Sequence, residues 1–307
     1  MADWAVLVVV PQDGTPGTHE VYEARFGAVG LDLDLLAGPD VVLPAVRART
    51  RVEGHWRDDG VCEAAVLLDL RRRILLLFAS EGPVTQLRHR AVTLRRLALA
   101  WPGWEPRWAY DGLAGLRVHL GLDPDAVRER DARVFPETPL EHDDEEVRER
   151  DPYLRIVTVG EHRCHLLTAV NDHPVTEGAA LLDRLAGAPR HGRCRAAVQS
   201  GLHIDPARRR IGWWLLGAVP RAGETAARWP GWTVGFWADR WTEHARAATG
   251  LFAPPRVHAG RALAELREEA AAHWAQRPGD GSWPGWMQAA VRREEADAVV
   301  ERIRSWR

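Results

Sequence analysis

The chain has 307 residues, 46% of them hydrophobic, and its 41 basic and 43 acidic residues give a formal net charge of −2. This composition is typical of a folded globular protein, and the near-neutral charge argues against a nucleic-acid partner or an anionic membrane surface. All the Lys and Arg positions are arginine, so Schiff-base, P-loop and kinase-type lysine chemistry is excluded.

Residue usage also indicates where the protein works. The richness in arginine, alanine, glycine and proline, with Asn171 as the single asparagine, indicates a high-GC coding bias and hence a bacterial source. The three cysteines, Cys62, Cys164 and Cys194, are too few for a disulfide framework and favour a reducing compartment. The N-terminal apolar run has no positive flank or cleavage site, and no stretch approaches the roughly 20 apolar residues of a membrane span. We therefore expect a soluble cytoplasmic protein.

Residues 1–122 predict one α+β half, in the order strand, short helix, strand, turn, strand, helix, strand, helix. The apolar strand "WAVLVVV" precedes "LDLDLLAGP", whose Asp32 and Asp34 fit either the outer side of a short helix or strand or a catalytic carboxylate pair. "CEAAVLLDLRRRILLLFAS" predicts two strands joined by a turn that Asp69 begins. Apolar residues at steps of three and four from Val84 to Trp101 predict an amphipathic helix.

The motif "WPGW" follows this helix and occurs three times, at residues 101–104, 229–232 and 283–286. Proline suits the second position of a type II turn and glycine the third, where φ is positive, so the motif predicts a tight reversal that brings two indoles together. The tryptophans then either seal a helix against the sheet or remain exposed as a stacking platform.

Residues 123–151 form an acidic segment with 12 acidic and 5 basic residues, a local charge of −7. Such a polar, proline-bearing run predicts a linker or an exposed helix, and "EHDDEE" within it lacks the pattern of a calcium loop. It could fold back on the arginines of the helix before the first WPGW. Arginine triplets in the two turns, at 71–73 and 208–210, could instead grip phosphate or carboxylate, or be solvated.

Residues 152–252 repeat the order of the first half. "CRAAVQSGLHIDPARRRIGWWLLGAV" and "WPGWTVGFWADRWTEHARAATGL" match the two corresponding stretches of the first half, and "ALLDRLAGAP" matches "LDLDLLAGP". We therefore predict an internally duplicated α+β fold, in which each half has a small antiparallel or mixed sheet covered by helices.

Residues 253–307 predict a helical C-terminal extension. "AGRALAELREEAAAHWAQ" suits one helix, and "RPGDGSWPGW" suits a loop. A final helix has an apolar stripe at about 3.6-residue spacing, formed by Met287, Val291, Val299, Ile303 and Trp306.

Residue types that bind metals gather in "EHRCH" and "HGRC". The candidates are His162, Cys164, His165, His191 and Cys194. In a strand, residues 162 and 164 share one face while 165 points away, and no CxxC pair is present. We therefore expect neither a metal nor a cofactor.

The aromatic composition favours a binding function. Fifteen tryptophans exceed ordinary usage, and "FWADRW" combines indoles with a carboxylate and a guanidinium. The predicted ligand-binding residues are Trp104, Trp108, Trp232, Trp237, Trp241, Asp239 and Arg240. The expected function is a non-catalytic binding or interaction protein that holds a protein or small-molecule partner.

The alternative is an enzyme that acts on a small molecule between the halves. No known catalytic signature is present, so the discriminating feature is asymmetry between the halves. His162, His165 and His173 have no clear counterparts in the first half, which favours the second half as the site of any chemistry.

Overall fold

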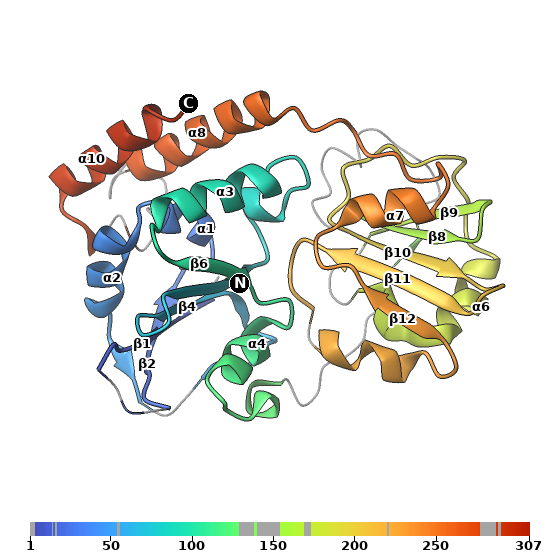
Figure 1. The fold of residues 1–307 in the computed structure, drawn as a ribbon, viewed down its shortest axis with the longest axis horizontal. Coiled ribbons are helices and arrows are strands. Elements are labelled where there is room, and N and C mark those ends of the chain that lie inside the picture. Colours follow the sequence, from blue (N-terminus) through green and yellow to red (C-terminus); the bar gives the residue numbers. More distant parts are fainter. Residues whose placement is uncertain are drawn as a thin grey trace. The chain divides into compact units, whose positions relative to one another are not determined.

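The computed structural model describes residues 4–13, 15, 17–53, 56–128, 138–139, 154–168, 173–219, 221–276, 287 and 290–307 (Figure 1). The chain divides into two compact units. Unit 1 comprises residues 1–130 together with 258–307, and unit 2 comprises residues 131–257. The C-terminal helices therefore belong to the first unit, although the second unit precedes them in the sequence.

Unit 1 is built on a mixed sheet with the strand order β3-β2-β1-β4-β5-β6. Its strands are β1 (Trp4–Val10), β2 (Glu20–Arg25), β3 (Arg51–Val52), β4 (Cys62–Asp69), β5 (Ile74–Ala79) and β6 (Glu105–Trp108). The β1–β4 and β5–β6 pairs are parallel, and the remaining pairs are antiparallel. The central strands are apolar from residue 64 to residue 68 in β4 and throughout β5, because both of their faces are covered.

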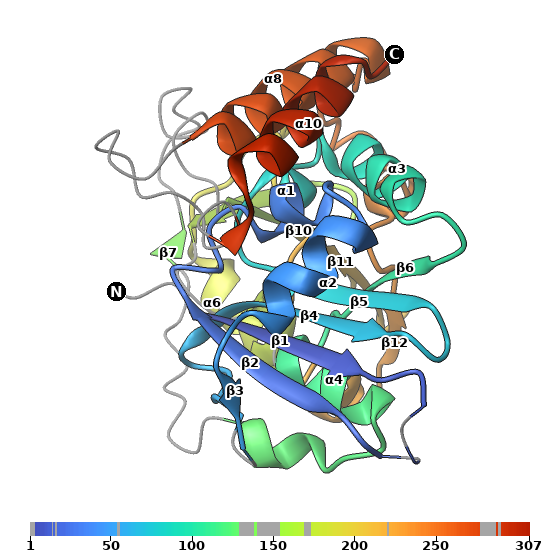
Figure 2. The same cartoon turned by 90° about the vertical axis from the view of Figure 1, so that its left-hand side faces the viewer.

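Helices cover both faces of this sheet. They are α1 (Leu31–Leu35), α2 (Pro39–Arg47), η1 (Pro83–Thr85), α3 (Arg90–Ala100), α4 (Gly112–His119), η2 (Pro124–Val127), α8 (Ala259–Ala275) and α10 (Arg293–Arg304). α8 and α10 lie side by side over α1, and α4 packs on β4 and β5 from the other side (Figure 2).

The C-terminal helices complete the core of unit 1. Leu266, Trp274, Met287 and Ile303 are fully buried in the same cluster as the α1 and β1 side chains. The Trp274 indole also donates a hydrogen bond of 3.1 Å to the carbonyl of Leu33 in α1. The tail is thus a part of the folded unit.

Unit 2 has its own mixed sheet, with the order β12-β11-β10-β8-β9-β7. Its strands are β7 (Thr138–Pro139), β8 (Arg155–Val159), β9 (Arg163–Thr168), β10 (Ser200–Asp205), β11 (Arg210–Leu215) and β12 (Thr233–Phe236). Its helices are η3 (Pro174–Ala180), α6 (Leu181–Ala186), η4 (Ala222–Arg228) and α7 (Trp241–Ala247). None of the described helices in either unit is long and apolar enough to cross a membrane.

The two sheets share one topology. β8, β9, β10, β11 and β12 occupy the places of β1, β2, β4, β5 and β6, with the same neighbours and the same parallel or antiparallel pairing. The predicted α+β class, with two halves of mixed sheet and helices, is confirmed. The common topology supports an internal duplication, which itself remains a prediction.

The two described WPGW motifs form the same corner. Gly103 and Gly231 both have φ of 77°, and in each copy the last tryptophan donates its backbone N–H to the carbonyl of the first at 3.1 Å. This is the predicted turn with positive φ at glycine. The indoles meet edge to face, with ring centroids 5.0 Å apart for Trp101–Trp104 and 5.2 Å for Trp229–Trp232.

The first indole of each corner anchors the turn to a helix. Trp101 and Trp229 are buried, and their Nε1–H groups donate to the carbonyls of Leu35 and Val175 at 2.7 and 2.8 Å. These carbonyls lie in α1 and η3, so the equivalent contacts match α1 with η3, whereas the sequence comparison matched residues 31–39 with residues 180–189, which contain α6. The corners therefore seal helices to the sheet.

Three details of the first half differ from the sequence-based predictions. Strand β2 was not predicted. The helix expected from Val84 begins only at Arg90, because the backbone of Gln86 is extended and resets the helical phase. Asp32 and Asp34 do not lie on an outer face but are completely buried. The predicted acidic segment beyond Arg128, apart from Thr138 and Pro139, and the third WPGW lie outside the described residues.

Candidate functional site

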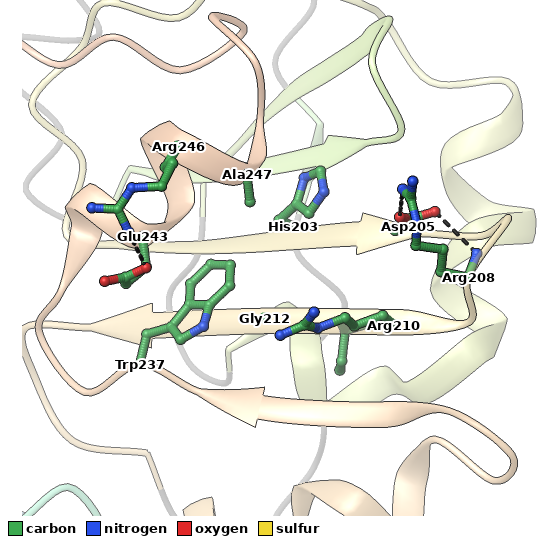
Figure 3. Close-up of a pocket in the computed structure, with 10 residues that line it drawn as sticks. His203, Asp205, Arg208, Arg210, Gly212, Trp237, Glu243, Arg246 and Ala247 are labelled. Atoms are coloured by element: carbon green, nitrogen blue, oxygen red, sulfur yellow. Dashed lines mark hydrogen bonds and ion pairs between the residues drawn. The ribbon is translucent and has the colours of Figure 1, made fainter.

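A cavity of about 340 Å³ lies in unit 2, between helix α7 and strands β10 and β11 (Figure 3). Its volume falls within the range of small-molecule sites. Polar and aromatic side chains that line it are His203, Asp205, Arg208, Arg210, Trp237, Glu243 and Arg246.

Glycine at position 212 makes room for the indole of Trp237. Gly212 lies directly opposite His203 in the antiparallel β10–β11 pair. A Cβ added to Gly212 would lie 1.8 Å from Cζ2 of Trp237, so no other residue fits beneath the ring without displacing it. The indole therefore rests on β11 and forms an apolar side of the cavity.

The cavity carries a net positive charge. Of its three arginines, Arg208 pairs with Asp205 at 2.8 Å and Arg246 pairs with Glu243. Arg210 is exposed, and no described carboxylate forms an ion pair with it. Three guanidinium groups against two carboxylates leave one net positive charge, which favours an anionic ligand.

Behind His203 lies a chain of buried hydrogen bonds. His203 Nδ1 is 2.9 Å from Thr158 Oγ1, which is 2.8 Å from Nε2 of His244. His244 Nδ1 lies 3.0 Å from the indole nitrogen of Trp214. Burial lowers the pKa of His203, although Asp205 acts in the opposite direction, and burial places the pKa of His244 well below its ordinary value. Both imidazoles are therefore neutral near pH 7.

The corresponding positions of unit 1 can be identified from equivalent backbone contacts. Asp69 pairs with Ile74 across one turn, as Asp205 pairs with Arg210 across the other, with the same loop length. After the parallel edge strand, the N–H of Ala109 donates to Leu77 as that of Trp237 donates to Trp213. These contacts place the two units in register, residue by residue.

In unit 1 this place is filled by apolar side chains. The residues matching Thr158, His203, Gly212, Trp237 and His244 are Val8, Leu67, Leu76, Ala109 and Leu116, all of them buried. The polar chain and the residues that make the cavity are thus properties of unit 2. In the sequence, such asymmetry between the halves was the feature expected to discriminate the enzyme alternative.

Of the predicted ligand-binding residues, Trp237 lines the cavity. Asp239, Arg240 and Trp241 lie in the connection to α7 and at its first residue, next to the cavity but outside its lining, and Arg240 Nε donates to the carbonyl of Trp237 at 3.1 Å.

Trp104 and Trp232 are the second, half-buried indoles of the WPGW corners. Trp108 is half-buried beneath the guanidinium of Arg90, whose Cζ lies 4.1 Å from the ring centroid. Trp104 and Trp108 belong to unit 1, and the other five predicted residues belong to unit 2.

His203, Thr158 and His244 were not predicted as site residues. The signal that could have found them is the aligned repeat itself, since "SGLHID" and the matching "AAVLLD" differ at this histidine. Thr158 is separated in sequence by 45 residues from His203 and by 86 residues from His244, so only the fold shows that the three side chains form one chain of hydrogen bonds.

The predicted metal-ligand types are dispersed. His162 is exposed in the β8–β9 turn, and His165 is buried with Nδ1 2.8 Å from the carbonyl of Pro189. Cys164 and His191 meet through a backbone bridge. Across the described part of the chain, no group of three or more His, Cys, Asp or Glu side chains is placed to hold a metal ion.

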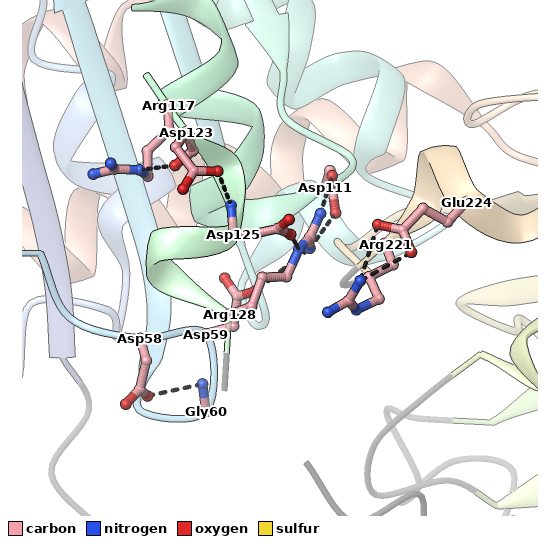
Figure 4. A network of polar contacts seen from close by, with 10 residues as sticks. All are labelled: Asp58, Asp59, Gly60, Asp111, Arg117, Asp123, Asp125, Arg128, Arg221 and Glu224. Atoms are coloured by element: carbon pink, nitrogen blue, oxygen red, sulfur yellow. Dashed lines mark hydrogen bonds and ion pairs between the residues drawn. The ribbon is translucent and has the colours of Figure 1, made fainter. Parts of the chain in front are cut away.

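Two of the described polar clusters of unit 1 have structural roles. Arg128 grips Asp111 through two hydrogen bonds of 2.8 Å and lies 3.6 Å from a carboxylate oxygen of Asp59, which ties the segment after η2 to the unit (Figure 4). His273 of α8 lies 2.7 Å from Asp34 of α1. This second pair joins the C-terminal helix to the core.

The fold and site define a protein of two α+β units that share one topology. At the matched position, unit 2 has a polar cavity and unit 1 has apolar side chains. The chain matches no known protein family, no curated protein and no solved structure.

Proposed function

We propose that this is a non-catalytic binding protein and that unit 2 holds a small organic anion in the cavity beneath α7. The observation that carries the proposal is the juxtaposition of Arg210, which forms no ion pair with a described carboxylate, with the indole of Trp237. A guanidinium can grip a carboxylate with two parallel hydrogen bonds, and an indole supplies apolar area.

The position of the cavity supports the same function. At the matched position of unit 1, buried apolar side chains stabilise the fold. Unit 2 has buried polar groups there, and burial of a polar group lowers stability unless the group is hydrogen-bonded. Such a cost is typical of sites that bind a ligand. The three described cysteines are free and buried, which supports a reducing cytoplasm as the protein's location.

The proposal is tested by isothermal titration calorimetry with acetate, benzoate and inorganic phosphate, and with benzylamine as a cationic counterpart. At least one anion should bind, and benzylamine should not. Arg210→Gln should weaken binding about tenfold or more, because it removes a charge-assisted contact. Arg193→Gln, at another exposed arginine of unit 2 outside the cavity, is the matched control. Absence of binding by all three anions, or equal loss in both variants, would reject this function.

A further inference from the structure

The hydrogen-bond chain behind His203 has a direction that is set at its buried end. The indole N–H of Trp214 can only donate, so Nδ1 of His244 must accept and the neutral ring keeps its proton on Nε2. That proton is donated to Thr158 Oγ1, and the hydroxyl of Thr158 then donates to Nδ1 of His203. His203 therefore carries its own proton on Nε2.

This order leaves His203 with one free ring nitrogen, and that nitrogen is a donor. His203 lines the cavity, and among the described residues Nε2 has no hydrogen-bond partner. A second proton would have to sit on Nδ1, where it would face the hydroxyl of Thr158 and remove that hydroxyl's acceptor. The chain thus opposes formation of an imidazolium and also leaves no basic nitrogen toward the cavity.

The charged groups around His203 are shared among the elements that enclose it. β10 contributes Asp205, and the turn and β11 contribute Arg208 and Arg210. α7 contributes Glu243 and Arg246 at the cavity and the neutral His244 beneath it. Asp205 is paired with Arg208 and Glu243 with Arg246, so Arg210 remains as the guanidinium that a ligand can engage.

Building on the binding function proposed above, we propose that the ligand is an aromatic carboxylate. Its carboxylate accepts a hydrogen bond from the uncharged Nε2–H of His203 and pairs with the guanidinium of Arg210, while its ring packs on Trp237. Thr158 and His244 are positioning residues that hold His203 in the donor tautomer.

The sheet geometry suits these contacts. Arg210 is the diagonal neighbour of His203, since His203 faces Gly212 two residues along β11, and such neighbours lie about 7–8 Å apart. That spacing lets both side chains reach one carboxylate. The one net positive charge of the lining matches a monoanion better than a phosphate dianion.

The test is a benzoate titration of the full chain by calorimetry, with acetate and inorganic phosphate as comparison probes, at about pH 5.5 and about pH 8, on either side of the ordinary histidine pKa. The wild-type affinity for benzoate should change less than about threefold between these values, because His203 stays neutral. Thr158→Val releases Nδ1, so binding should become tighter at the acidic value, whereas Thr158→Ser should restore the flat profile. Nitrogen-15 NMR of the His203 ring, assigned with His203→Gln, should show a proton on Nε2 alone.

The outcomes separate this inference from the proposed function. Binding of phosphate or acetate that is equal to or tighter than that of benzoate would keep the anion-binding function and overturn the aromatic carboxylate. Wild-type binding of benzoate that strengthens about tenfold toward acid pH, or an Nδ1–H tautomer in the spectrum, would overturn the donor role of His203. No binding of any anion would overturn both. Alkylation of the buried Cys194 checks that the variants remain folded, and the tautomer of the wild type is informative even if they do not.

Discussion

At the scale of single residues, glycine decides whether the cavity exists. Unit 1 has Leu76 at the position where unit 2 has Gly212, and Ala109 where unit 2 has Trp237. In unit 2 the small residue thus lies on β11 and the large one directly after the edge strand β12, where Trp237 lines the cavity. Gly212 is thus a requirement of packing, and its φ is not in the left-handed region.

Gly212→Ala should displace the indole of Trp237, because the added Cβ would lie 1.8 Å from a ring carbon. Overpacking of this kind costs about 1–3 kcal/mol of stability. The measurement is the NMR signal of the Trp237 indole N–H, together with benzoate affinity. Gly217→Ala is the control, since a Cβ there meets no atom within 4 Å. An unmoved Trp237 signal in Gly212→Ala would contradict this packing.

At the scale of elements, the WPGW motif was predictable as a turn, but the burial of its tryptophans was not. Proline and glycine at fixed positions define a type II reversal in any context, whereas burial of Trp101 and half-burial of Trp104 depend on α1, which lies 66 residues earlier in the chain. The predicted start of α3 was wrong for the same reason, because the extended backbone of Gln86 depends on its surroundings.

Gly103→Ala and Gly231→Ala should each destabilise their own unit by about 1 kcal/mol, because alanine is strained at positive φ. Pulsed alkylation during denaturant unfolding measures this, since Cys62 is buried in unit 1 and Cys194 in unit 2. Gly103→Ala should advance the labelling of Cys62, and Gly231→Ala that of Cys194. Gly187→Ala, where φ is −99° and the space is open, is the control. Equal effects on both cysteines would contradict separate corners.

At the scale of the whole molecule, the sequence predicted two related halves, and the shared topology agrees with it. It did not predict that the C-terminal helices belong to unit 1. An amphipathic stripe indicates that a helix packs against other elements, but it does not identify those elements. The cavity could not be predicted from any local sequence pattern either, since its residues come from strands and a helix that are distant in sequence.

Trp274→Ala tests whether the C-terminal helices belong to unit 1. Its indole is fully buried against α1, and removal of a buried tryptophan costs about 3–5 kcal/mol. Labelling of Cys62 should therefore shift to lower denaturant concentration while that of Cys164 and Cys194 stays unchanged. Trp229→Ala is the matched variant of unit 2 and should have the reverse effect.

The same junction should make unit 1 depend on pH. Burial raises the pKa of Asp32 from its ordinary 3.8 to about 7 and also raises that of Asp34. Burial lowers the pKa of His273, but the charge and hydrogen bond of Asp34, together with the charges of Asp32 and Glu269, outweigh burial and raise this pKa above its ordinary value. Each of these groups holds protons in the folded state at pH values where the unfolded chain has lost them.

Stability should therefore fall as pH rises, by up to about 1.4 kcal/mol for each pH unit and each extra proton held. For Asp32 the loss extends from its ordinary pKa to about 7, and for His273 it continues above 6.5. Cys62 should thus become accessible at lower denaturant concentration at about pH 8 than at about pH 5.5, with the labelling pulse itself given at one fixed pH.

Asp32→Asn separates titration from packing. The amide cannot accept from both the Leu33 and the Val84 N–H groups as the carboxylate does, so the variant should be less stable at every pH. Because position 32 no longer titrates, the slope of stability against pH below about 7 should flatten. A wild-type unit 1 whose stability is constant or rises over this range would show that the buried carboxyl groups of α1 do not hold the extra protons, and the α1–α8 junction would then act by packing alone.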